Sequence, residues 1–71
     1  MENYAIALLD ACEALKLDSN NVKGYYRRAQ AYAAMRQLKN AVADFKKVCQ
    51  IQPSNKDARE KYEITQKEHR L

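Results

Sequence analysis

The amino-acid sequence predicts an all-α fold of about four antiparallel helices, arranged as helix-turn-helix repeats. Its 71 residues include one Gly and one Pro, so few positions interrupt a helix. Apolar residues recur at the three- and four-residue spacing of one helix face. The apolar pattern is also written twice, at an offset of 34 residues, and this period is typical of helix pairs that bury their apolar faces by stacking.

The repeat appears when the chain is compared with itself at this offset. Ala7 falls on Ala41, and Asp10 falls on Asp44. Apolar residues also fall on apolar residues, as in the pairs Tyr4 and Leu38, Leu8 and Val42, Ala14 and Val48, and Leu17 and Ile51. Because Asp10 and Asp44 occupy equivalent positions, we interpret them as surface or helix-pairing residues and not as a catalytic carboxylate pair.

The first two helices are predicted from their periodicity and from the polar residues between them. The first runs from about residue 3 to residue 17, and residues 18–21 break it. Asn21 is placed to cap a second helix that runs to about Met35. Gly24, early in this second helix, costs about 1 kcal/mol relative to Ala and therefore indicates close approach of a ligand or of a neighbouring helix.

The third and fourth helices follow a turn near residues 36–37. The third runs from about residue 38 to residue 51, and Pro53 prevents its continuation. Ser54 and Asp57 have the spacing of a capping box, which predicts a fourth helix from there toward the end of the chain. Four aromatic residues at helical spacing are predicted to belong to the core: Tyr25, Tyr32, Phe45 and Tyr62.

Composition argues against an enzyme, a membrane protein and a metal protein. No apolar run is long enough for a membrane span, and no phosphate-binding loop or nucleophile elbow is present. Cys12 and Cys49 lack the spacing of a zinc site and are interpreted as small hydrophobic residues. His69 is interpreted as a solvated histidine. We therefore expect no catalytic residue, no metal and no cofactor, in a soluble intracellular chain.

Residues 22–53 resemble one complete tetratricopeptide repeat. The residues that carry the resemblance are Tyr25, Ala29, Tyr32, Ala41, Phe45 and Pro53. Residues 1–18 resemble the second helix of a preceding, truncated repeat, and residues 54–71 resemble the helix that caps such arrays. The resemblance implies a right-handed superhelical array. Two residues depart from the family pattern, because Arg28 stands where Leu is usual and Arg36 stands where Gly normally makes the turn.

The segment 22–29, together with residues 55–58, resembles more closely the third repeat of chaperone-binding co-chaperones, a class that includes serine/threonine phosphatases. The resemblance implies that Lys23 and Arg27 belong to a carboxylate clamp. The clamp would hold the C-terminal Glu-Glu-Val-Asp tail of the ninety- and seventy-kilodalton heat-shock chaperones. It also implies a cytoplasmic location, with the nucleus as an additional one, and autoinhibition of a parent phosphatase domain as a further role.

Helical phase supports the same pair independently. Lys23 and Arg27 are four residues apart, so their β-carbons lie about 5–6 Å apart on one helix face. An acidic peptide would relieve their repulsion and accept charge-assisted hydrogen bonds, bidentate ones from Arg27. Gln30 lies one turn further on, and Tyr26 borders the same face. The predicted peptide-binding residues are therefore Lys23, Tyr26, Arg27 and Gln30.

Two other functions remain open from the sequence. The net charge of +4 and the basic residues beside Tyr25 and Tyr26 are compatible with nucleic-acid binding, and the chain could also be a purely structural segment of an array. Arg28 is expected to pack its stem on apolar surface and to extend its charge into water.

The resemblance begins in mid-repeat, so one face of the first helix is expected to lack its partner. We predict that this face exposes Tyr4, Leu8 and Leu15 and that it promotes self-association or marginal stability. Further clamp residues of the family come from earlier repeats, so the binding of a tail by this chain alone is expected to be weak.

Overall fold

A computed structural model describes residues 3–70, and all four predicted helices are present in it. They are α1 (Tyr4–Leu17), α2 (Val22–Ala34), α3 (Leu38–Ile51) and α4 (Lys56–Arg70). The all-α class is therefore confirmed, and α1 and α2 each end within one residue of the predicted bounds. Residues 1–2 and 71, at the ends of the first and last predicted segments, lie outside the described residues.

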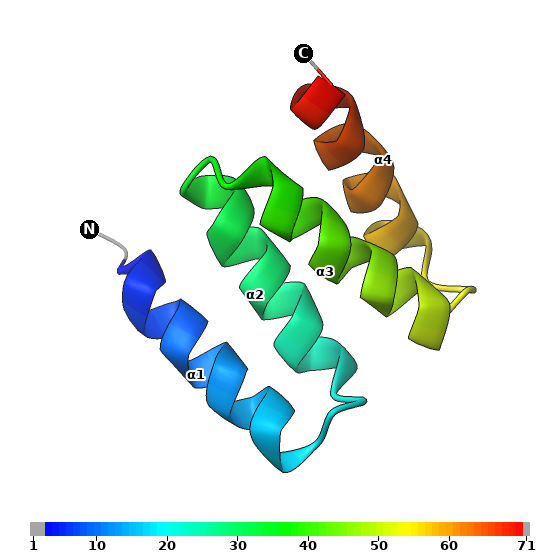
Figure 1. Cartoon of the computed structure of the whole chain (residues 1–71). Helices are drawn as coiled ribbons and strands as arrows, with labels where there is room; N and C mark the ends of the chain where they lie inside the picture. The colour runs from blue at the N-terminus through cyan, green and yellow to red at the C-terminus, as the bar shows by residue number, and fades with distance from the viewer. Residues whose placement is uncertain (1–2, 71) are drawn as a thin grey trace.

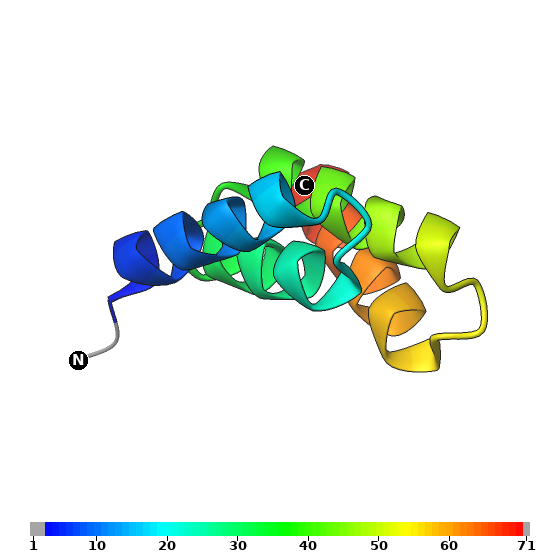
Figure 2. The ribbon, with the colours of Figure 1, turned by 90° about the horizontal axis from the view of Figure 1, so that it is seen from below.

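Each helix packs against the next helix along the chain (Figure 1). Viewed from below, α1 and α3 form one layer and α2 and α4 form the other (Figure 2). The chain thus alternates between two layers, which confirms the predicted helix-turn-helix arrangement. As a result, α2 lies between α1 and α3, and its remaining faces are free to form a surface.

The core lies where α2, α3 and α4 meet. Ala29, Ala41 and Phe45 are buried there, and the small alanine side chains allow close approach of the helices. Tyr32 and Tyr62 pack against this cluster, so these two predicted core residues and Phe45 are confirmed. The ring of Tyr26 also packs on the cluster and meets Phe45 edge to face, with ring centres 5.7 Å apart.

Two asparagines confirm or correct the predicted helix starts. Asn21 caps α2 as predicted, because its Oδ1 accepts a hydrogen bond of 3.0 Å from the backbone N–H of Gly24. The capping box predicted from Ser54 and Asp57 is wrong. Asn55 instead accepts from the N–H of Ala58 at 3.0 Å, since it directly precedes Lys56 and can reach the first turn of α4.

Gly24 is buried against α1. A β-carbon at this position would lie 3.2 Å from both Cγ and Cδ2 of Leu15. Of the two explanations expected from the sequence, close approach of a neighbouring helix is therefore the one that the structure supports.

Arg28 differs from its prediction in an informative way. It faces the neighbouring helices as expected and keeps 23% of its side chain exposed, but its charge is paired with a carboxylate instead of extending free into water. Its Nε and Nη2 donate to the two carboxylate oxygens of Asp44 on α3, at 2.7 and 2.8 Å. This side-chain hydrogen bonding raises the pKa of Arg28, although partial burial acts in the opposite direction. The expectation lacked this ion pair, because Asp44 offers a bidentate partner at the helix interface.

The guanidinium of Arg28 has two further neighbours. Its Cζ lies 5.6 Å from the centre of the Tyr25 ring, and Nη1 lies 3.8 Å from Sγ of Cys12 on α1. Arg28 thus links three helices, and Tyr25, predicted as core, is half-buried beneath it. Both aspartates confirm their interpretation, since Asp44 is a buried helix-pairing residue and Asp10 is an exposed surface residue.

Of the three apolar residues predicted to be exposed on α1, Tyr4 is exposed, whereas Leu8 and Leu15 are not. Leu8 and Leu15 are half-buried because they lie toward α2, whereas Ile6, Leu9 and Leu17 are exposed at 55%, 68% and 91%. Tyr4 is exposed at 37%. Apolar side chains on α1 therefore face solvent as expected, but apart from Tyr4 they are not the predicted ones. Whether it promotes self-association stays a prediction.

The turn between α2 and α3 is built around Arg36, which has a positive φ of 63°. The N–H of Gln37 donates to the carbonyl of Tyr32, and that of Arg36 donates to Ala33, which is the Schellman pattern of a helix end. The position therefore favours Gly, the residue that the family usually has there. Here Arg36 adopts this strained backbone conformation. Its side chain forms an exposed ion pair with Glu68, at 3.2 Å.

Asp44→Asn should destabilise the chain by about 2 kcal/mol, because it leaves the guanidinium of Arg28 without its anionic partner in a largely buried site. The free energy of unfolding in urea, followed by circular dichroism, measures the effect. Glu68→Gln is the control: it removes an exposed ion pair and should cost less than about 0.5 kcal/mol. Equal losses in the two variants would contradict the role assigned to Asp44.

Arg36→Gly should stabilise the chain by about 1 kcal/mol, since Gly adopts a positive φ without the steric cost that Arg36 bears. Arg36→Ala removes the same ion pair but keeps the strained backbone, so it should be no more stable than the parent. Thermal unfolding of both variants gives the comparison. The idea fails if Gly and Ala at this position unfold at the same temperature.

Candidate functional site

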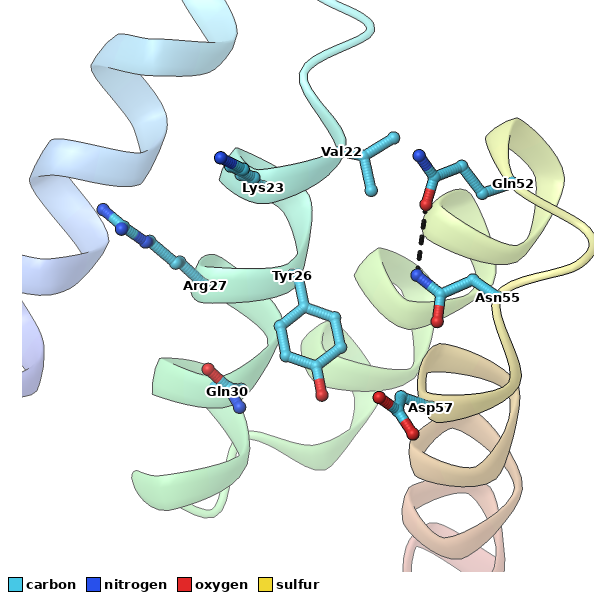
Figure 3. A pocket seen from close by; sticks show the side chains of 8 residues that line it. All are labelled: Val22, Lys23, Tyr26, Arg27, Gln30, Gln52, Asn55 and Asp57. Atoms are coloured by element: carbon cyan, nitrogen blue, oxygen red, sulfur yellow. Dashed lines mark hydrogen bonds between the residues drawn. The ribbon is translucent and has the colours of Figure 1, made fainter.

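Helix α2 presents Lys23 and Arg27 together. Asn21 fixes the start of the helix, and the two cations follow one turn apart, both exposed and on the same side of α2 in Figure 3. Both line a pocket of about 540 Å³ that is open to solvent. The predicted juxtaposition of the two side chains in an open trough is therefore present in the structure.

The other two sequence-predicted residues line the same pocket. The ring of Tyr26 projects into it, and the amide of Gln30 lies one turn beyond Arg27 (Figure 3). Because Tyr26 also packs edge to face against buried Phe45, the core holds its ring in place. The pocket thus combines two cations, an aromatic wall and an amide that can donate or accept hydrogen bonds.

Four further residues line this pocket that were not predicted as site residues from the sequence: Val22, Gln52, Asn55 and Asp57. Val22 precedes Lys23 on α2, whereas the others come from the α3–α4 connection and the first turn of α4. The Nδ2 of Asn55 donates to Oε1 of Gln52 at 3.1 Å, so these two amides hold each other. The family resemblance includes residues 55–58, and Asp57 also has the spacing of a capping box with Ser54, but nothing in helical phase indicates that these residues face α2.

Arg27 also borders two neighbouring hollows between α1 and α2. One, of about 390 Å³, is lined by Tyr4, Asp10, Arg27 and Gln30, among others. The other, of about 190 Å³, lies beside Asp10, Lys23 and Arg27. Since Arg27 is common to all three hollows, an extended ligand bound at Arg27 could continue toward either α1 or α4.

The charges of the two cations are available for a ligand. Within residues 3–70, no ion pair or hydrogen bond engages the side chain of Lys23 or of Arg27, whereas the adjacent Arg28 is committed to Asp44. Two carboxylates, Asp10 on α1 and Asp57 on α4, flank the cationic pair. The arrangement can bind an anion by charge-assisted hydrogen bonds, with Arg27 able to grip a carboxylate with two of them.

Other chemistry finds little support among residues 3–70. No group of three His, Cys, Asp or Glu side chains could hold a metal ion there. None of the described helices is both long enough and apolar enough to cross a membrane. Burial raises the pKa of Cys49, which makes its thiol less reactive, and His69 is exposed in the last turn of α4.

The chain is similar to known proteins along almost its whole length. Residues 22–55 match the family described as tetratricopeptide repeat. The chain is 42% identical over 62 residues to serine/threonine-protein phosphatase 5 of Rattus norvegicus, which covers 87% of this chain and 12% of that protein. It is 45% identical over 70 residues to the peptidyl-prolyl cis-trans isomerase FKBP4 of Mus musculus, which covers 99% of this chain and 15% of that protein.

A fungal relative gives the same picture. The chain is 44% identical over 61 residues to serine/threonine-protein phosphatase T of Aspergillus oryzae, covering 86% of this chain and 13% of that protein. In each of these relatives the chain spans a small part of the whole length, between 12% and 15%.

Proposed function

The chain belongs to the tetratricopeptide repeat family through residues 22–55, and we propose that the exposed side of α2 binds the acidic C-terminal tails of partner proteins. The repeat is a protein-interaction fold, so this stretch of chain is a binding module and not an enzyme. The observation that carries the proposal is the open pocket in which Lys23 and Arg27 lie together, unpaired with any other described residue, beside Tyr26 and Gln30.

In the proposed complex the terminal carboxylate of the ligand lies at Arg27, which donates two parallel hydrogen bonds, and Lys23 supplies a second positive charge one turn earlier. Gln30 offers a hydrogen bond to the ligand backbone, and the Tyr26 ring supports an apolar side chain. Because the pocket is open, an extended peptide can enter it without any rearrangement of the helices.

For the partner, we propose the Glu-Glu-Val-Asp tail of the ninety- and seventy-kilodalton heat-shock chaperones, in the cytoplasm and the nucleus. The support is the resemblance of the segment 22–29 to the chaperone-binding co-chaperones, together with the similarity to phosphatase 5 and FKBP4. The two phosphatases among the relatives also support a regulatory role, in which this module inhibits a phosphatase domain of the same protein until a tail binds.

Lys23→Ala and Arg27→Ala should each weaken the binding of a free Glu-Glu-Val-Asp peptide about tenfold or more, because each removes a charge-assisted hydrogen bond. A titration followed by NMR chemical shifts suits the weak affinity expected. Lys39→Ala is the matched control, since Lys39 is exposed on α3 and does not line this pocket. If both α2 variants keep the parent affinity while helicity is unchanged, the proposal is wrong.

Nucleic-acid binding is the second candidate, favoured by the net charge of +4 and by two exposed cations beside the Tyr26 ring. The structure supports nucleic-acid binding less than the sequence does, because Arg28 is bound to Asp44 and does not contribute its charge to a basic patch.

Amidation of the peptide separates the two candidates. Tail capture requires a free terminal carboxylate, so the amidated Glu-Glu-Val-Asp peptide should bind about tenfold more weakly than the free acid. A single-stranded oligonucleotide should bind weakly or not at all. Nucleic-acid binding would instead be indicated by tight oligonucleotide binding that falls steeply with salt concentration, together with equal binding of the two peptides.

A further inference from the structure

The pocket on α2 carries opposite charges at its two sides. Lys23 and Arg27 lie on one side, and the carboxylate of Asp57, on α4, points into the pocket from the other (Figure 3). Resting on the proposed function, we infer that Asp57 determines specificity at the single upstream position of the tail whose side chain reaches α4: at that position it favours a basic side chain and disfavours an acidic one.

The carboxylate of Asp57 is free to act on a ligand. It is exposed, and among residues 3–70 no hydrogen bond or ion pair to its side chain is present. The residue stands in the first turn of α4, where a negative charge is favourable for the helix, but Asn55 already provides the cap of this helix. Capping therefore leaves the Asp57 carboxylate unused.

The other groups on this side of the pocket are neutral and engaged. Gln52 and Asn55 hold each other by a hydrogen bond of 3.1 Å, and Oδ1 of Asn55 accepts from Ala58. Val22 is apolar. Of the residues that line this side, Asp57 is the one that carries a charge, so it dominates the electrostatic preference of the pocket away from α2.

A peptide anchored by its terminal carboxylate at Arg27 can cross the pocket toward α4. One of the side chains that precede the terminus then approaches Asp57. A Lys or Arg there forms an exposed ion pair, and a Glu there is repelled. Since exposed pairs contribute little each, the preference should be about two- to fivefold. That is enough to rank tails that share the same terminal residue.

The test uses the full chain and a set of acetylated Glu-Glu-Val-Asp peptides with a free C-terminus. In each peptide one of the three positions before the terminal Asp is changed to Glu, Gln or Lys while the other positions stay the same. The affinity of each peptide for the protein is measured by NMR titration. They are measured for the parent, for Asp57→Asn and for Glu60→Gln. Glu60 is exposed on α4 and does not line this pocket, so both variants change the net charge equally but only one alters the pocket.

We compare the ratio of the dissociation constants of the Glu and Lys peptides within each protein, which cancels differences in overall stability and attraction. At the peptide position whose side chain approaches Asp57, the ratio of dissociation constants should be about two- to fivefold lower in Asp57→Asn than in the parent. In Glu60→Gln the ratio should equal that of the parent. Asp57→Lys should lower it further. The inference is overturned if the ratio is the same in all proteins at every position while Arg27→Ala still weakens binding about tenfold or more. If the parent binds none of the peptides, the proposed function itself fails.

Discussion

The ion pair between Arg28 and Asp44 ties one side of α2 to α3, and the residues that α2 can present to solvent follow from that constraint. Two short hydrogen bonds join the guanidinium to the carboxylate across the α2–α3 interface, and the same guanidinium also touches Cys12 of α1. Successive residues of an α-helix point about 100° apart. With Arg28 held inside, Arg27 must therefore emerge on another side, and Lys23 emerges with it one turn earlier.

Tyr26 connects this buried framework to the pocket. Its ring meets Phe45 in the core and also forms part of the pocket wall, so the packing of the core positions the surface. On the opposite side of α2, Gly24 lets Leu15 approach closely, which brings α1 near enough to shape the hollows beside Arg27. Gly24 facing α1 and Tyr26 facing the pocket thus both help to shape the open trough.

Local features of this molecule could be predicted from its sequence, whereas features that depend on contacts between helices could not. Helical phase was sufficient to place Lys23 and Arg27 on one side of α2, because both lie in one helix. The partner of Arg28 lies 16 residues away on α3, and periodicity does not predict which charged residues meet across an interface. Asp57 was missed for the same reason, since only the packing of α4 brings it to the pocket.

The errors made on single elements also have physical causes. Ser54 and Asp57 have the spacing of a capping box, but Asn55 lies next to the first helical residue and provides the side-chain acceptor of the first turn. On α1, two rows of apolar residues compete to face α2. The row that contains Leu15 faces α2, because Leu15 fits closely over Gly24, and Leu9 therefore remains exposed to water. The sequence does not predict this outcome, because it depends on the distance between the helices.

Arg27 and Arg28 are neighbours in the chain, yet Arg28 is bound to Asp44 at the helix interface and Arg27 is exposed at the pocket. Apart from Tyr26, which does both, the residues of α2 that hold the helices together and the residues that line the proposed peptide site therefore form separate sets. A library that randomises the exposed set and keeps Arg28, Asp44 and the alanine contacts would retain the framework while sampling new ligand preferences. This short helical unit thus has the organisation required of an engineerable recognition scaffold.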